Sequence, residues 1–262
     1  MIESNFEKLK EFIDGFNRIL IPVSGGLDST FLLFFTRKHF PEKRLWAVHF
    51  SGPFFYEEDD EFIRELCEDL GVMLFEREFN HFSLKIDSEK RRCALCKSKM
   101  LEILESILVE NGGNYIFSSE VSGENLDLRD GFKILKKNEK VIFPLLESKI
   151  TKEDIVRYFN EAGRKDLIRP KNSCLLTRFG ADIEVNSGDL ERIKRGERFI
   201  RSLGFKDVIR LRLKGKNTCI IEISMNELRE KILNLTTFEF LSFMDGLGFK
   251  DVFLDLKGYG EF

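Results

Sequence analysis

The chain has 262 residues, and its 42 Lys and Arg nearly balance its 45 Asp and Glu, which gives a formal net charge of −3 at pH 7. This length allows one large domain or two modest ones, and the small net charge does not indicate a nucleic-acid-binding protein. No apolar run reaches the length of a membrane span, and the N-terminal residues from Phe6 to Phe16 follow an amphipathic helical pattern instead of a signal peptide. We therefore expect a cytoplasmic protein with no membrane partner.

A short apolar run from Ile19 to Val23 leads into Ser24-Gly25-Gly26-Leu27-Asp28-Ser29, and an apolar segment long enough for a helix follows from Thr30. This order predicts a strand, a glycine turn and a helix. Two adjacent glycines allow φ > 0 and turn backbone N–H groups toward one point, where the helix adds its positive dipole end. The segment therefore predicts an anion-binding nest sized for phosphate, with an ordinary turn as the alternative. It lacks the Lys of a P-loop and the third Gly of a dinucleotide fingerprint.

Further strands are predicted at 45–50, 72–75 and 115–118, with helices at 57–70 and from residue 90 through 107 or 108. Residues 119–130 form a polar loop that carries Arg129. A strand-like run at 141–146 precedes a helix that begins with Thr151 as N-cap and ends near Gly163. Alternating strands and helices predict a parallel sheet, in which ligands bind at the carboxyl ends of the strands, where the nest lies.

From Pro170 the alternation of strands and helices gives way to a loop. We place a domain boundary at about Gly180, so that residues 1–180 form one domain and residues 181–262 the other. Residues 199–208 recur weakly as 243–252, each as a helix end, a glycine stop and a strand. With a strand at 218–224 between them, the order predicts a small α+β domain of one antiparallel sheet and two helices. Arg210 and Arg212 alternate on one strand face within a basic stretch, which indicates either a phosphate clamp or a solvated face.

Five cysteines in a reducing compartment indicate metal ligands, catalytic thiols or buried thiols. Cys93 and Cys96 form a CxxC pair at a helix start among basic residues that favour thiolates. Cys174 lies in a polar loop and could complete a three-cysteine site on a four-iron cluster, which would leave one iron open for a ligand such as sulfide. Catalytic thiols without metal and inert thiols are the alternatives. Cys67 and Cys219 lie on apolar faces and are expected in the core.

Several motifs together resemble one family. The glycine turn resembles the SGGxDS signature of the PP-loop ATP pyrophosphatases, which split ATP into AMP and pyrophosphate. With RRCALCK at 91–97, ESKITKEDI at 147–155, SCLLTR at 173–178, the 195–213 stretch with CIIEI at 219–223, and LDLKGYG at 254–260, the chain resembles the LarE-type sulfur transferases over nearly its full length. Where that family usually has DGTN and YRPG segments, this chain differs and keeps only the Arg-x-Gly of Arg129 to Gly131.

The resemblance implies an α/β fold with a parallel-sheet PP-loop (HUP, adenine nucleotide alpha-hydrolase-like) domain and a smaller C-terminal α+β domain for substrate binding or oligomerisation. It implies an ATP-dependent sulfurtransferase of the nickel-pincer cofactor type, which adenylates a substrate carboxylate and inserts sulfur. The implied cofactors are ATP, Mg²⁺ and a [4Fe-4S] cluster. Sulfur would come from cluster-bound sulfide or from Cys174 itself. Expected partners are a small anionic mononucleotide-like substrate, a sulfide or other sulfur donor, and copies of the same chain.

The candidate residues follow from these motifs. The catalytic candidates are Asp28, Cys174 and Arg178, and the metal ligands would be Cys93, Cys96 and Cys174. Nucleotide and substrate would be bound by Ser24, Gly25, Gly26, Leu27, Asp28, Ser29, Arg129, Arg210 and Arg212. Glu197 and Glu222 match acidic family positions and could hold a metal or be surface acids.

Two other functions remain open from the sequence. A tRNA thiolation enzyme of the PP-loop type shares the nest, the adenylation and in some cases the cluster, but it needs an RNA partner. The small net charge disfavours that reading, whereas the basic stretch keeps it open. A non-catalytic nucleotide-binding module would leave the Cys174 loop without a role.

Overall fold

The computed structural model describes residues 2–80, 89–126, 130–169, 173–180 and 183–258. These residues divide into two compact units. The first comprises residues 2–51, 57–79, 90–126 and 130–169, and the second comprises 52–56, 80, 89, 173–180 and 183–258. Each unit has its own sheet, and the predicted domain boundary at Gly180 stays a prediction.

The first unit is built on a five-stranded sheet with the order β3-β2-β1-β4-β5. All four strand pairs are parallel, as the alternation of strands and helices predicts. The central strand β1 is almost wholly buried, because helices cover both faces of the sheet. The strands are β1 (Ile19–Pro22), β2 (Leu45–Ser51), β3 (Met73–Glu78), β4 (Tyr115–Phe117) and β5 (Val141–Ile142).

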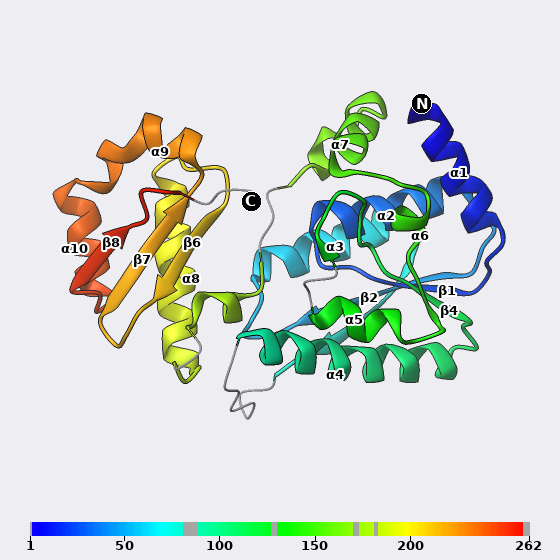
Figure 1. The fold of residues 1–262 in the computed structure, drawn as a ribbon, viewed down its shortest axis with the longest axis horizontal. Coiled ribbons are helices and arrows are strands. Elements are labelled where there is room, and N and C mark those ends of the chain that lie inside the picture. The colour runs from blue at the N-terminus through cyan, green and yellow to red at the C-terminus, as the bar shows by residue number, and fades with distance from the viewer. Residues whose placement is uncertain (1, 81–88, 127–129, 170–172, 181–182, 259–262) are drawn as a thin grey trace. The chain divides into compact units, whose positions relative to one another are not determined.

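Helices flank this sheet, with α4 and α5 along one side and α1, α2 and α7 along the other (Figure 1). Phe31 on α2 is fully buried and lies 5.3 Å, centroid to centroid, from both Phe35 and Tyr158. Phenylalanines of α2 thus help to fill the core of the first unit. The helices of this unit are α1 (Ile2–Asp14), α2 (Leu27–His39), α3 (Glu57–Asp69), α4 (Glu89–Glu110), α5 (Asp130–Lys136), α6 (Pro144–Glu147), α7 (Lys152–Glu161) and the 3₁₀ helix η2 (Lys165–Leu167).

The predicted strand at 141–146 is wrong in its second half. The strand ends at Ile142, and α6 begins at Pro144, which occupies the first turn of that helix. Proline is suited to this position because it has no N–H to leave unpaired and its φ is already helical. Helix α5 was not predicted, since its seven residues directly follow the polar loop and are too few for a clear periodicity.

The second unit has a three-stranded sheet with the order β6-β7-β8. Strands β6 and β7 are antiparallel, but β7 and β8 are parallel, so the prediction of a purely antiparallel sheet is wrong. The two helices between β7 and β8 return the chain to the starting end of β7, which makes the next strand parallel. The elements are η3 (Leu175–Arg178), α8 (Ser187–Ser202), β6 (Ile209–Leu213), β7 (Thr218–Ile223), α9 (Met225–Lys231), η4 (Ile232–Leu235), α10 (Phe238–Gly246) and β8 (Asp251–Leu254).

The weak internal repeat corresponds to two equivalent helix stops. Gly204 follows α8 with φ +94°, and Gly248 follows α10 with φ +83°. Only glycine adopts this left-handed conformation without strain, so each helix ends there and a strand follows. The sequence predicts both stops, and the strands that follow them, β6 and β8, lie on either side of β7.

Within the described part of the chain, no helix combines the length and the apolar character that crossing a membrane requires.

Candidate active site

The nest connects the end of β1 to the start of α2. Gly25 has φ +72°, whereas Gly26 has φ −79° and serves as the N-cap of α2. The prediction of positive φ therefore holds for only one of the two glycines. No side chain caps the helix through a hydrogen bond, although the first N–H groups of a helix have no partner within it. Such N–H groups and the helix dipole are the features by which helix N-termini bind anions, so the turn has the backbone arrangement that the predicted anion site requires.

Two serines close the nest. The Ser24 N–H donates to Ser29 Oγ at 3.1 Å, and Ser29 Oγ donates to the Gly26 carbonyl oxygen at 3.2 Å. Ser29 is buried, while Asp28 beside it is half-buried in the first turn of α2. Helix α2 begins at Leu27, earlier than expected. Both side chains therefore have fixed directions at the helix start, and the carboxylate of Asp28 lies at the turn.

Three further side chains, which sequence reasoning did not single out, surround the nest. His49 on β2 is buried, with Nδ1 2.9 Å from the Val23 carbonyl oxygen and Nε2 2.7 Å from Asp60 Oδ1. A Cβ built on Gly25 would lie 3.3 Å from Asp59 Cβ and 3.4 Å from Arg169 Nη1. The first turn of α3 and the segment after η2 thus contact the nest. Such contacts come from long-range packing, so no local sequence signal could have found them.

The second unit holds the Cys174 loop through Arg178. The Arg178 side chain is 2% exposed, and its Nε and Nη2 contact the two carboxylate oxygens of Glu197 at 2.8 and 3.0 Å. Its Nη1 donates to the Ser173 carbonyl oxygen at 3.2 Å and to Thr177 Oγ1 at 3.0 Å. Arg178 therefore ties the loop around Cys174 to α8. The expected catalytic role of Arg178 stays a prediction, but its guanidinium is already used inside this unit.

Glu197 is fully buried, and its carboxylate accepts hydrogen bonds from three residues. Besides Arg178, the Leu211 N–H donates to Glu197 Oε1 at 2.8 Å, and the Tyr56 hydroxyl donates to Oε2. Burial and the negative charge of Glu197 raise the pKa of Tyr56, so the hydroxyl stays protonated and keeps donating. Burial alone would lower the pKa of Arg178, but the charge of Glu197 outweighs it and the pKa rises. Glu197 is therefore not a surface acid, and its carboxylate is occupied by protein donors.

Strand β6 alternates as predicted. Ile209, Leu211 and Leu213 are buried, and Arg210 and Arg212 occupy the other face. Arg212 Nε donates to Glu222 Oε1 at 2.6 Å, and Arg212 Nη1 donates to the Thr177 carbonyl oxygen at 2.5 Å. The structure thus brings together Arg178, Arg212 and the Cys174 loop within one unit.

The five cysteines differ in how far their side chains are exposed to solvent. Cys93 is exposed, and Cys96, one turn later on α4, is half-exposed, as is Cys174 in the second unit. Cys67 and Cys219 are buried, and burial raises the pKa of their thiols to about 11 and about 12. Among the described side chains of each unit, no group of three or more His, Cys, Asp or Glu is placed to hold a metal. The prediction that Cys93, Cys96 and Cys174 share one cluster stays a prediction.

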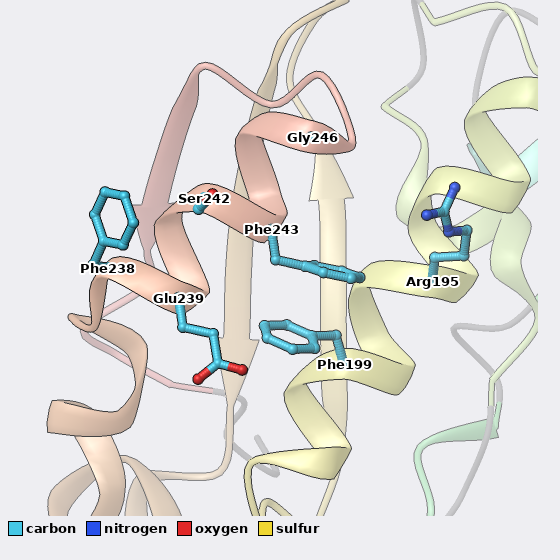
Figure 2. Close-up of a pocket in the computed structure, with 7 residues that line it drawn as sticks. All are labelled: Arg195, Phe199, Phe238, Glu239, Ser242, Phe243 and Gly246. Carbon is cyan, nitrogen blue, oxygen red and sulfur yellow. The ribbon is translucent and has the colours of Figure 1, made fainter.

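One predicted binding residue, Arg129, falls outside the described residues. A cavity of about 580 Å³ lies between α8 and α10 in the second unit, where the rings of Phe199 and Phe243 stack with centroids 3.9 Å apart (Figure 2). None of the predicted site residues lines this cavity, so it is not the nucleotide site that the sequence indicates. Its other lining residues are Arg195, Phe238, Glu239, Ser242 and Gly246.

We expect Arg178→Met and Glu197→Gln each to lower the free energy of unfolding by about 3–5 kcal/mol, because each leaves a buried charge or its donors without a partner. The double variant should lose less than the sum of the two. Urea unfolding followed by circular dichroism measures this. The exposed pair of Arg64 and Glu76 serves as control, since Arg64→Met should leave the free energy of unfolding nearly unchanged. Strictly additive losses would contradict the coupling of Arg178 with Glu197.

In chelator-treated, reduced protein at pH 8, we expect iodoacetamide to modify Cys93, Cys96 and Cys174 but not Cys67 or Cys219. A thiol whose pKa is raised to about 11 or about 12 has about one thiolate in a thousand molecules or fewer at this pH, and the thiolate is the nucleophile. Peptide mass spectrometry identifies the modified residues, and denatured protein, in which all five react, is the control. Fast modification of Cys67 or Cys219 in folded protein would contradict the assignment.

No family model matches the chain. It is 27% identical over 263 residues to the uncharacterized protein slr1717 of Synechocystis, covering 99% of this chain and 96% of that one. It is 25% identical over 254 residues, 92% of this chain and 87% of the relative, to the pyridinium-3,5-bisthiocarboxylic acid mononucleotide synthase of Lactiplantibacillus plantarum, and is thus a distant homologue of that enzyme. It is 34% identical over 181 residues to the uncharacterized protein MJ0830 of Methanocaldococcus jannaschii, 68% of this chain and 67% of that one. The chain therefore belongs to the same family as the Methanocaldococcus protein.

Proposed function

We propose that this chain is an ATP-dependent sulfur transferase, which activates a carboxylate of a small anionic mononucleotide with AMP and replaces the activated oxygen by sulfur. The nest between β1 and α2 carries the proposal, because no side chain caps the N-terminus of α2 there and Gly25 has the turn conformation that aims N–H groups at an anion. The substrate class is proposed from the homologue in Lactiplantibacillus plantarum, whose name describes a synthase of a bisthiocarboxylic acid mononucleotide.

The first step makes the carboxylate reactive. A carboxylate oxygen of the substrate attacks the α-phosphorus of ATP, a new P–O bond forms, and the bond from that phosphorus to the bridging oxygen breaks. Pyrophosphate leaves with the electron pair, and the nest N–H groups with the dipole of α2 stabilise the charge that develops on it. Asp28, an oxygen ligand of the type that Mg²⁺ prefers, would hold the metal that neutralises the phosphates.

The second step replaces oxygen by sulfur. If the donor is hydrosulfide, its sulfur attacks the acyl carbon, AMP leaves with the electrons of the C–O bond, and the proton is lost to give a thiocarboxylate. If the donor is Cys174, its thiolate forms a thioester as AMP leaves. Loss of the Cα proton and cleavage of the Cβ–S bond then give the thiocarboxylate and dehydroalanine. The second route uses up one chain for each sulfur.

The thiols of this chain fit a cluster by their type and accessibility. Cys93 and Cys96 are one turn apart on α4 and reach the surface, and Cys174 is also accessible, whereas the two remaining cysteines are buried. These three thiolates would hold a [4Fe-4S] cluster. When bound, such a cluster would supply exchangeable sulfide through its fourth iron.

Arginines of the second unit would serve the substrate in two ways. Arg178 positions the Cys174 loop through Glu197, as its buried contacts indicate. Arg210 and Arg212 would bind the phosphate or carboxylates of the mononucleotide, since they share the half-buried face of β6. Arg212 also donates to the carbonyl oxygen of Thr177, so substrate binding and the position of the Cys174 loop would be connected.

We expect ATP to be converted to AMP and pyrophosphate in the presence of nicotinic acid mononucleotide as test substrate, as measured by phosphorus NMR. Asp28→Asn should lower this rate by about 100-fold or more, because the metal-neutralised charge in the transition state would be lost. Glu239→Gln is the matched control, since it also neutralises a first-turn carboxylate, on α10 of the other unit. Formation of ADP and orthophosphate would contradict the proposal, and turnover only with tRNA would favour the RNA-thiolating alternative.

We expect protein that is purified or reconstituted without oxygen to bind about four irons per chain and about as much sulfide. Cys93→Ala, Cys96→Ala and Cys174→Ala should each lower the iron content, while Cys67→Ala, which removes a buried thiol, should not. Iron and sulfide assays with the absorbance spectrum measure this. If iron is absent after reconstitution and mass spectrometry shows that Cys174 loses hydrogen sulfide during turnover, the sacrificial route replaces the cluster.

A further inference from the structure

Arg169 lies beside the nest and has a donor without a partner. A Cβ built on Gly25 would be 3.4 Å from Arg169 Nη1, so the guanidinium reaches the glycine itself. Nη1 is buried and has no hydrogen-bond partner among the residues that the structure describes. An unsatisfied buried donor is unfavourable in a native protein, and one at a functional site indicates a missing ligand.

The remaining contacts of Arg169 hold its guanidinium in place. Nη2 lies 3.1 Å from Asp59 Oδ1 and donates to the Glu58 carbonyl oxygen at 3.4 Å. The guanidinium carbon lies 4.1 Å from the centroid of the Phe62 ring. Just before Arg169, Leu167 is buried in the core of the first unit, and Ile168 packs against that core. The side chain is thus oriented from two sides, and Nη1 faces the nest.

Arg164, in the same segment, differs from Arg169 in that all of its guanidinium nitrogens are paired within the protein. Its Nε and Nη2 donate to Asp166 at 3.0 to 3.1 Å, and its Nη1 donates to Asp69 at 3.1 Å. It too lies over an aromatic ring, that of Phe34, at 5.3 Å. Every guanidinium nitrogen of Arg164 therefore has a carboxylate partner. Nη1 of Arg169 has no partner among the described residues and can donate to a ligand.

We propose that Arg169 is a phosphate-binding residue of the nest, whose Nη1 donates to the β- and γ-phosphate oxygens of ATP and stays with the pyrophosphate as it leaves. The inference rests on the proposed function, because it takes the nest as the site of a nucleoside triphosphate. A planar guanidinium suits phosphate oxygens, and its charge adds to that of the helix dipole. The Asp59 carboxylate, which lies beside Gly25, keeps Arg169 in position but would repel an anion by itself.

The test measures binding of pyrophosphate, ATP and AMP to the full chain by isothermal titration calorimetry. Arg169→Met removes the charge but keeps an apolar chain over Phe62. It should weaken pyrophosphate and ATP binding by about 10- to 100-fold, the effect of a lost charge-assisted hydrogen bond, and change AMP binding little. Arg169→Lys should restore part of the loss. Arg164→Met is the matched control and should bind pyrophosphate like the unaltered chain.

Asp59→Asn separates anion binding from a structural role. It removes the negative charge that would repel an anion but keeps an amide oxygen that can accept from Arg169 Nη2, so pyrophosphate binding should not weaken if Arg169 binds the anion. Equal weakening by Arg169→Met and Asp59→Asn, or no weakening by Arg169→Met, would overturn the inference and leave the proposed function in place. If the unaltered chain binds neither pyrophosphate nor ATP, the proposed function itself is wrong and the inference falls with it.

Discussion

The left-handed conformation of Gly25 at the end of a buried parallel strand is the constraint on which the first unit depends. A side chain there would be strained and would also meet Asp59 and Arg169. The central strand β1 lies between β2 and β4, its pairing with β2 continues to Pro22, and α2 then begins at Leu27 with no side-chain cap. The sheet thus holds a set of backbone donors in position before any ligand arrives, which is what binding a phosphate with little reorganisation requires.

The arrangement of the second unit depends on the buried carboxylate of Glu197. Isolating Glu197 from water would be strongly unfavourable, but Arg178, the Leu211 N–H and Tyr56 all donate to it. These donors come from the Cys174 loop, from β6 and from the segment at 52–56, which lies far away in the sequence. One carboxylate therefore fixes the loop that carries Cys174. A buried ion pair adds little net stability, yet it specifies one arrangement, because every alternative leaves a charge unpaired.

The spacing of apolar residues and the positions of glycines at turns and helix ends predicted much of this structure. The strand, turn and helix at 19–39 and the stops at Gly204 and Gly248 follow from residue types that act locally. The parallel pairing of β7 with β8 was missed because α9 is short and gives no clear apolar period. The strand that ends at Ile142 shows a proline overriding an apolar run. The positions of Arg178 and Arg169 depend on partners distant in sequence, which no local pattern reports.

Arg178 and Arg169 differ in whether all of their guanidinium nitrogens have partners within the protein. Every guanidinium nitrogen of Arg178 has a protein partner, so its charge is neutralised in place within the second unit. Arg169 keeps one buried nitrogen without a partner among the described residues, and a buried donor without a partner is unfavourable. On the proposed role of Arg169, a phosphate that accepts from this nitrogen would remove that penalty, and the affinity of the nest for an anion would rise.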